Sequence, residues 1–165
     1  LMEKREHNFS TVEGTKDAII FECIQQGLTR HQIAYVLATV EHETNKTFKP
    51  VREAYWLSET WRKKNLRYYP YYGRGYVQIT WLKNYDYYSK LLKVDMVKDQ
   101  DIAMRENVAL YILVHGFKNG IFTGKKISDY INPNKVDFYN ARRCINGIDR
   151  AADIAKLAES WLKKL

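Results

Sequence analysis

Apolar residues recur at helical spacing along most of this chain, and this periodicity limits the folds that are open to it. Residues 29–44 give the clearest case, because Thr29 and Gln32 form a capping-box pattern at the start of an apolar helical face. Residues 15–27 carry a second apolar face and end at Gly27, a common helix stop. We therefore predict a helix pair joined by a short glycine turn.

The rest of the chain predicts more helices and at most a minor sheet. The apolar run at residues 101–118 is the longest and indicates the central helix of the core. A turn or small hairpin is favoured at residues 65–80, where Pro70, Gly73 and Gly75 stand among tyrosines. Further helices are predicted at residues 53–64, 81–92, 126–131, 136–144 and 149–165.

These elements predict one mainly α domain over residues 1–165, since no linker, repeat or low-complexity block divides the chain. Residues 1–13 are expected to be disordered or left over from cloning, because Leu1 precedes Met2. No stretch approaches the roughly 20 apolar residues that cross a bilayer. The N-terminus also lacks the apolar run of a secretory signal, so we expect a protein made and held in the cytoplasm.

The formal net charge of +8 predicts attraction to polyanions such as nucleic acid, anionic lipid or the bacterial wall. The 27 Lys and Arg are scattered, so charge alone does not select among these partners and is also explained by an ordinary solvated surface.

Cys23 and Cys144 match no metal or redox spacing. Two buried free thiols are expected, with a disulfide as the alternative.

Two glutamates ten positions apart, Glu43 and Glu53, are candidates for acid–base chemistry. Glu43 closes a predicted helix, where apolar neighbours and the negative end of the helix dipole both favour a protonated carboxyl. Glu53 follows in a loop or a first helical turn, where the opposite field favours the ionised form. Glycosidic hydrolysis needs such a pair. The alternative is that both are surface carboxylates that balance the many cations.

Aromatic side chains supply a second signal. The chain has thirteen tyrosines and four tryptophans, and many stand in "YYPYYGRGYVQITW", residues 68–81. Sugar rings have apolar faces and hydroxyl rims, so an aromatic groove with Gln, Asn and Thr would suit them. The aromatics could instead fill the core, or stack on nucleic-acid bases between the basic residues.

Three motifs together resemble family 19 glycoside hydrolases, which include plant-type chitinases and many bacteriophage endolysins. The motifs are "HET" at residues 42–44, "YYGRGYVQITWLKNY" at 71–85 and "CING" at 144–147. The resemblance spans residues 32–147 and is closer to the compact endolysin branch than to the longer plant enzymes. It implies a lysozyme-like helical fold with a central cleft and a small β or loop region.

The resemblance also implies roles for individual residues. Glu43 matches the general acid, and Glu53 falls near the base that activates water, with Glu59 as a competitor. Thr80 matches the residue that holds the attacking water, and Arg74 matches a structural arginine. Polar and aromatic residues expected to bind substrate are Gln78, Asn84, Tyr72 and Asn146. The implied reaction inverts the anomeric centre and uses no metal or organic cofactor.

Rival functions remain open at this level. The four histidines, His7, His31, His42 and His115, lack the spacing of a zinc hydrolase. A non-catalytic wall-binding module is a second alternative. A nucleic-acid-binding domain is a third, although no helix-turn-helix or RNA-binding motif is present.

Within the enzyme reading, the charge and the motifs favour peptidoglycan over chitin as substrate. A contact with anionic outer-membrane lipid is also expected from the basic surface. We expect a monomer that does not bind nucleic acid and that waits in the host cytoplasm until it reaches the wall.

Overall fold

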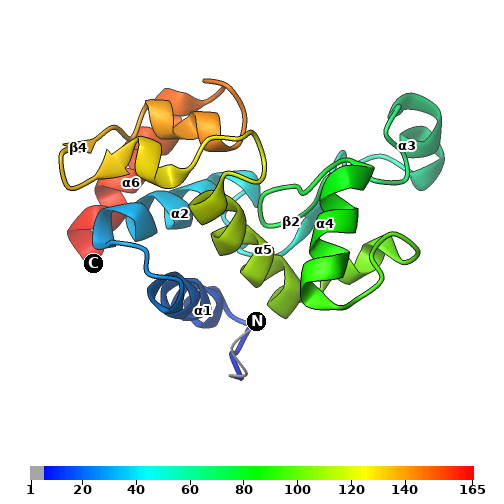
Figure 1. Cartoon of the computed structure of the whole chain (residues 1–165), viewed down its shortest axis with the longest axis horizontal. Coiled ribbons are helices and arrows are strands. Elements are labelled where there is room, and N and C mark those ends of the chain that lie inside the picture. The colour runs from blue at the N-terminus through cyan, green and yellow to red at the C-terminus, as the bar shows by residue number, and fades with distance from the viewer. Residues whose placement is uncertain (1–5) are drawn as a thin grey trace.

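The computed structural model describes residues 6–165, so the expectation for residues 1–5 lies outside it. The fold is mainly helical, with two small two-stranded sheets (Figure 1). No described helix has both the length and the apolar character needed to span a membrane. The α-helices are α1 (Val12–Gln25), α2 (Arg30–Glu43), α3 (Glu59–Asn65), α4 (Leu82–Leu92), α5 (Glu106–Asn119) and α6 (Ala151–Lys164).

Short strands and 3-10 turns connect these helices. Strand β1 (Val51–Arg52) pairs antiparallel with β2 (Arg74–Gly75), and β3 (Ile131–Asn132) pairs antiparallel with β4 (Lys135–Val136). The predicted hairpin within residues 65–80 is present, since Arg74 bridges to Ile79. The 3-10 helices are η1 (Gln100–Met104), η2 (Ile127–Asp129) and η3 (Asn140–Cys144).

The predicted helix pair is confirmed in its local chemistry. At the start of α2 the Thr29 side chain accepts from Gln32 N–H, and the Gln32 side chain accepts from Thr29 N–H. This reciprocal pair satisfies two backbone donors that a helix start would otherwise leave free. Gly27, just beyond α1, has φ +81°, a conformation that glycine adopts without a Cβ clash. This positive φ angle of Gly27 allows the tight turn between α1 and α2.

Helix α5 lies between two apolar cores. One face packs with α1, α2 and α6 through residues such as Leu113 and Phe117, whereas the other packs with α4 and η1 through Tyr111 and Ile112. The central helix predicted at residues 101–118 is therefore present, but its first turn is not. Arg105 has extended backbone angles and separates η1 from α5. Helix α5 thus joins two halves of the fold, one with α2 and α6 and the other with α4 (Figure 1).

Two other helix predictions were wrong in part. Residues 53–58 are not helical, because Ser58 caps α3 by accepting from Trp61 N–H at 3.1 Å. Residues 136–144 form the end of β4 and the 3-10 helix η3 rather than an α-helix.

Cys23 and Cys144 are free and buried, as expected, and burial raises the pKa of both thiols.

Candidate active site

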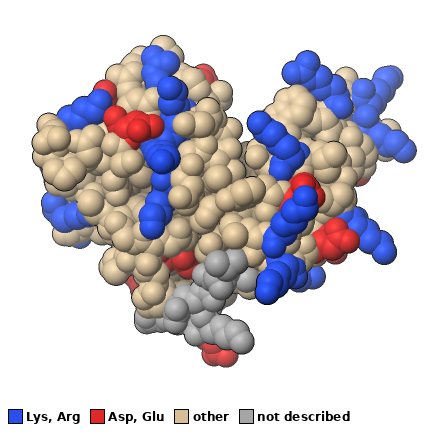
Figure 2. Space-filling view, viewed as in Figure 1, with Lys and Arg blue, Asp and Glu red and all other residues tan. Residues whose placement is uncertain are grey.

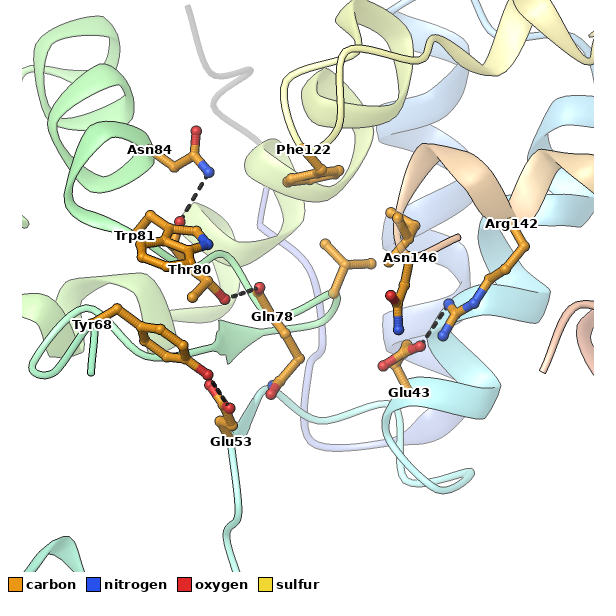
Figure 3. Close-up of a pocket in the computed structure, with 12 residues that line it drawn as sticks. Glu43, Glu53, Tyr68, Gln78, Thr80, Trp81, Asn84, Phe122, Arg142 and Asn146 are labelled. Carbon is orange, nitrogen blue, oxygen red and sulfur yellow. Dashed lines mark hydrogen bonds and ion pairs between the residues drawn. The ribbon is translucent and has the colours of Figure 1, made fainter. Parts of the chain in front are cut away.

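A polar pocket with a volume of about 430 Å³ lies between the α2 half and the α4 half of the fold. Glu43 and Glu53 line it from opposite sides, with Gln78 between them (Figure 3). Its full lining is Glu43, Glu53, Tyr68, Val77, Gln78, Thr80, Trp81, Asn84, Phe122, Arg142, Ile145 and Asn146. We call it the active-site pocket.

Glu43 is the last residue of α2, as the sequence predicts. The helix stops there because Asn45 and Lys46 adopt positive φ angles of 49° and 69°. The Thr44 hydroxyl donates to Val40 O at 2.7 Å and accepts from Phe48 N–H at 2.9 Å, which fixes the turn. This turn holds the half-buried Glu43 side chain at the edge of the pocket.

The surroundings of Glu43 differ from the apolar niche that the sequence predicts. Arg142, which is buried, donates from Nη1 to Glu43 Oε1 at 2.8 Å and from Nε to the backbone oxygen of Asp149 at 2.7 Å. The guanidinium is thus fixed in η3 and holds one oxygen of the carboxyl. The other oxygen, Oε2, is the one that can carry a proton toward a ligand.

Replacing Arg142 with methionine is expected to destabilise the fold by about 3 kcal/mol, because it leaves the half-buried Glu43 carboxyl without its partner. Any reaction that uses the Glu43 carboxyl should slow as well, since that carboxyl loses the contact that orients it. Urea unfolding monitored by circular dichroism measures the first effect. Arg143→Met, which removes the exposed neighbouring guanidinium, is the matched control and should cost little. Equal losses in the two variants would contradict the assigned role of Arg142.

Glu53 follows strand β1 and is held through both its backbone and its carboxyl. Its N–H donates to Gly73 O at 2.7 Å, and its Oε1 accepts from Gly73 N–H at 2.9 Å. Its Oε2 accepts from the Tyr68 hydroxyl. Behind it, the buried Arg62 guanidinium donates to three backbone carbonyls within residues 53–57. Both carboxylate oxygens are therefore satisfied as hydrogen-bond acceptors, which suits an ionised group.

Gly73 allows the backbone to approach this carboxyl closely. A Cβ built at Gly73 would lie 2.7 Å from Gln78 Oε1 and 2.9 Å from Gln78 Cβ. Gln78 is itself fixed, because its Nε2 donates to Val51 O at 2.9 Å. Only a residue without a side chain therefore fits between the β1–β2 pair and Gln78.

Tyr68→Phe is expected to lower kcat about tenfold for a reaction that uses Glu53, because a hydrogen bond to a charged group contributes about 1.5–3 kcal/mol and holds Glu53 in place. Tyr69→Phe is the matched control: its hydroxyl donates to Glu59 at 2.8 Å, outside the pocket. Steady-state rates on soluble glycan fragments would compare the two. A similar loss in both variants would mean that general destabilisation, not the position of Glu53, explains the effect.

Glu59, the sequence-level competitor of Glu53, lies outside the active-site pocket. Its carboxyl pairs with Arg62 at 3.0 Å and accepts from the Tyr69 and Tyr72 hydroxyls. Burial opposes ionisation here, but the hydrogen bonds from Tyr69, Arg62 and Tyr72 outweigh it and lower the pKa of Glu59. Of the two candidates, the structure brings only Glu53 into one pocket with Glu43.

Tyr72 is the one predicted substrate-binding residue that the structure removes from the site. Its side chain is fully buried, and its ring packs 3.8 Å from the Arg74 guanidinium. Arg74 also donates to Pro70 O, to the Tyr85 hydroxyl and to Asp101. Arg74 is therefore buried and structural, as the resemblance implies. Tyr72 packs against Arg74 and does not line the active-site pocket.

The other predicted residues, Thr80, Gln78, Asn84 and Asn146, all line the pocket. Thr80 Oγ1 donates to Gln78 O at 2.8 Å, and Asn84 Nδ2 donates to Thr80 O at 2.9 Å (Figure 3). These bonds use the Thr80 proton and one Asn84 donor. They leave the Thr80 oxygen as an acceptor and the Asn84 side-chain oxygen unengaged by this pair.

Sequence reasoning missed six pocket residues: Arg142, Tyr68, Trp81, Phe122, Val77 and Ile145. Trp81 and Tyr68 lie within the aromatic segment and could have been proposed, because residues 68–81 also hold Gln78 and Thr80. Arg142 carries no local signal, since it reaches Glu43 across a separation of 99 residues. Among residues 6–165, no group of three metal-ligating side chains lies together.

No protein-family model matches this chain, and no curated protein matches it. Among solved structures, it is similar to chitinase C from Streptomyces griseus HUT6037. The likeness has a TM-score of 0.61 at 18% identity and covers 96% of this chain and 72% of that chain. At this identity the likeness establishes the fold alone. The predicted lysozyme-like, mainly helical fold is thereby confirmed.

Proposed function

We propose that this protein is a glycoside hydrolase that cleaves the β-1,4 glycan backbone of bacterial peptidoglycan. The observation that carries the proposal is the placement of Glu43 and Glu53, from different halves of the fold, on opposite sides of one polar pocket. The shared fold with a chitinase supports glycan cleavage in general. Two carboxyls that flank the scissile bond supply the acid and the base of such a reaction.

In the proposed mechanism, Glu43 protonates the glycosidic oxygen from Oε2, while Arg142 holds its Oε1. Glu53 accepts a proton from a water molecule on the opposite face of the sugar. Thr80 orients that water, because its own proton is donated to Gln78 O and its oxygen can only accept. Attack from the opposite face inverts the anomeric centre, which requires carboxyls about 6.5–9.5 Å apart. Proton NMR of fresh products should show the α-anomer first.

The choice of peptidoglycan rests on charge and on the endolysin-like motifs. Lys and Arg side chains stand on both halves of the face in Figure 2 and outnumber the acidic ones there. A cationic surface favours a polyanionic wall over neutral chitin. We therefore propose an endolysin-type role, with anionic outer-membrane lipid as a second contact of the basic surface. Wall lysis should weaken with rising salt while cleavage of short neutral oligomers persists; equal salt sensitivity would remove this steering role.

Mass spectrometry of digested, purified peptidoglycan tests the proposal directly. Products that end in reducing N-acetylmuramic acid would support a lysozyme-type cut, and reducing N-acetylglucosamine would move the cut to the other linkage. Cut peptides with intact glycan would refute glycosidase action.

Chitin is the second candidate substrate, favoured by the likeness of the fold to that of a chitinase. Parallel digestion of N-acetylglucosamine oligomers separates the two. A much higher kcat/KM on these oligomers than on wall glycan would transfer the proposal to a chitinase.

A further inference from the structure

A second pocket, of about 920 Å³, adjoins the active-site pocket and shares Trp81, Asn84 and Phe122 with it. We call it the side pocket. Its remaining lining residues are Leu82, Lys83, Asp86 and Val97. Figure 3 shows the three shared residues on the side of the active-site pocket away from Glu43 and Glu53. A ligand in the active-site pocket can therefore extend a substituent into the side pocket.

The side pocket differs in chemistry from the active-site pocket. Its walls are largely apolar, and Trp81 and Leu82 are 43% and 50% exposed, which is high for large apolar side chains. A sugar ring with its hydroxyl rim would find few hydrogen-bond partners there. Asp86 is paired with Lys90 at 3.0 Å, whereas Lys83 forms no ion pair with any of residues 6–165. The side pocket thus combines an apolar surface with the Lys83 ammonium group, while the Asp86 carboxylate is already engaged by Lys90.

Trp81 lines both pockets, and its neighbours hold it in place. It has φ +75°, a conformation that is strained for a non-glycine residue and that persists only where the surroundings enforce it. Its N–H donates to Tyr71 O at 2.8 Å, and its ring packs 4.9 Å from the Tyr68 ring and 5.4 Å from the Arg67 guanidinium. These contacts hold the exposed indole in one orientation, where it lines both pockets.

We propose that the side pocket binds the peptide that peptidoglycan carries on its sugars, while the glycan backbone occupies the active-site pocket. This inference rests on the proposed function and deepens it. The wall peptide is short, acidic and rich in alanine, so its methyl groups suit the apolar wall and its carboxylates suit Lys83. Chitin has no such substituent. The side pocket would therefore make the enzyme select peptide-bearing glycan.

The test compares two forms of one substrate: purified peptidoglycan glycan with its peptides, and the same glycan after an amidase has removed them. Release of reducing ends gives kcat/KM for each. The wild-type protein should prefer the peptide-bearing form about tenfold, and a Leu82→Asn, Lys83→Glu double variant should lose that preference while it cleaves stripped glycan at the wild-type rate. Lys156→Glu, an exposed α6 substitution with the same charge change, should keep the preference.

Each outcome separates this inference from the proposed function. The wild-type protein could cleave both forms equally, or the double variant could lose kcat/KM by the same factor on both forms. Either result would mean that the side pocket does not recognise the peptide. The hydrolase assignment would stand in both cases. The second pattern would instead indicate further sugars in the side pocket. If neither form yields reducing ends, the proposed function fails and this inference fails with it.

Discussion

A Glu43→Gln variant is expected to lose about 10²- to 10⁴-fold in kcat on wall glycan, the usual contribution of a general acid. Glutamine keeps the shape of the side chain and an oxygen that can accept from Arg142 Nη1, so the fold should persist. What it lacks is a proton to give to the leaving oxygen. Steady-state release of reducing ends measures the loss, and circular dichroism confirms that the helices remain.

Glu41→Gln is the matched control on the same helix. Glu41 accepts from Trp161 Nε1 at 2.8 Å and does not line the active-site pocket, so its amide should leave kcat unchanged. A substrate with an aryl leaving group sharpens the test, because a phenolate departs without being protonated. The Glu43→Gln variant should recover most of its rate on that substrate. No recovery, or a wild-type rate on wall glycan, would remove Glu43 from the role of acid.

Glu53→Gln should be as damaging, again by about 10²- to 10⁴-fold, because the attacking water loses its base. The amide also replaces an acceptor with an N–H group, opposite either the Gly73 N–H or the Tyr68 hydroxyl. One of these two contacts must therefore weaken or reorient. The rate should stay low on the aryl substrate, since water activation is still needed there. This contrast assigns the base and the acid separately.

Glu59→Gln decides between the two candidates for the second carboxylate. Glu59 lies outside the pocket and supports the Arg62 and Tyr72 side chains, so its loss should reduce stability and leave kcat near the wild-type value. A second check uses Glu53→Ala with added azide, an anion that attacks without a base. Formation of a glycosyl azide would restore turnover. If Glu59→Gln abolished cleavage and Glu53→Gln did not, the assignment would have to be reversed.

The sequence predicted Glu43 well because its position depends on local signals. Thr29 and Gln32 mark the start of α2, and the loss of apolar spacing after Thr44 marks its end. The resemblance placed Glu53 near the expected base, and the sequence left its local structure open between a loop and a first helical turn. The signal that could have corrected it is Ser58, an N-cap residue with Glu59 in the first turn of α3.

Contacts between segments that lie far apart along the chain could not be predicted from the sequence. The pairing of Val51–Arg52 with Arg74–Gly75 rests on two residues per strand, too few to leave a pattern. Burial of Tyr72 depends on the meeting of Arg74, Asp101 and the β1–β2 pair behind the site, so a tyrosine within the motif looked like a sugar-binding ring. The break at Arg105 was likewise hidden within an apolar run.

The close contact at Gly73 has a consequence for directed evolution of substrate range. Libraries that diversify the pocket should yield no functional substitution at position 73. Every alternative side chain there displaces Gln78 and the loop that anchors Glu53. Position 146 lies on an exposed turn, where Gly147 has no atom within 4 Å of a built Cβ. New specificities are thus accessible from the α6 side of the pocket, and the β1–β2 side is the part to leave untouched.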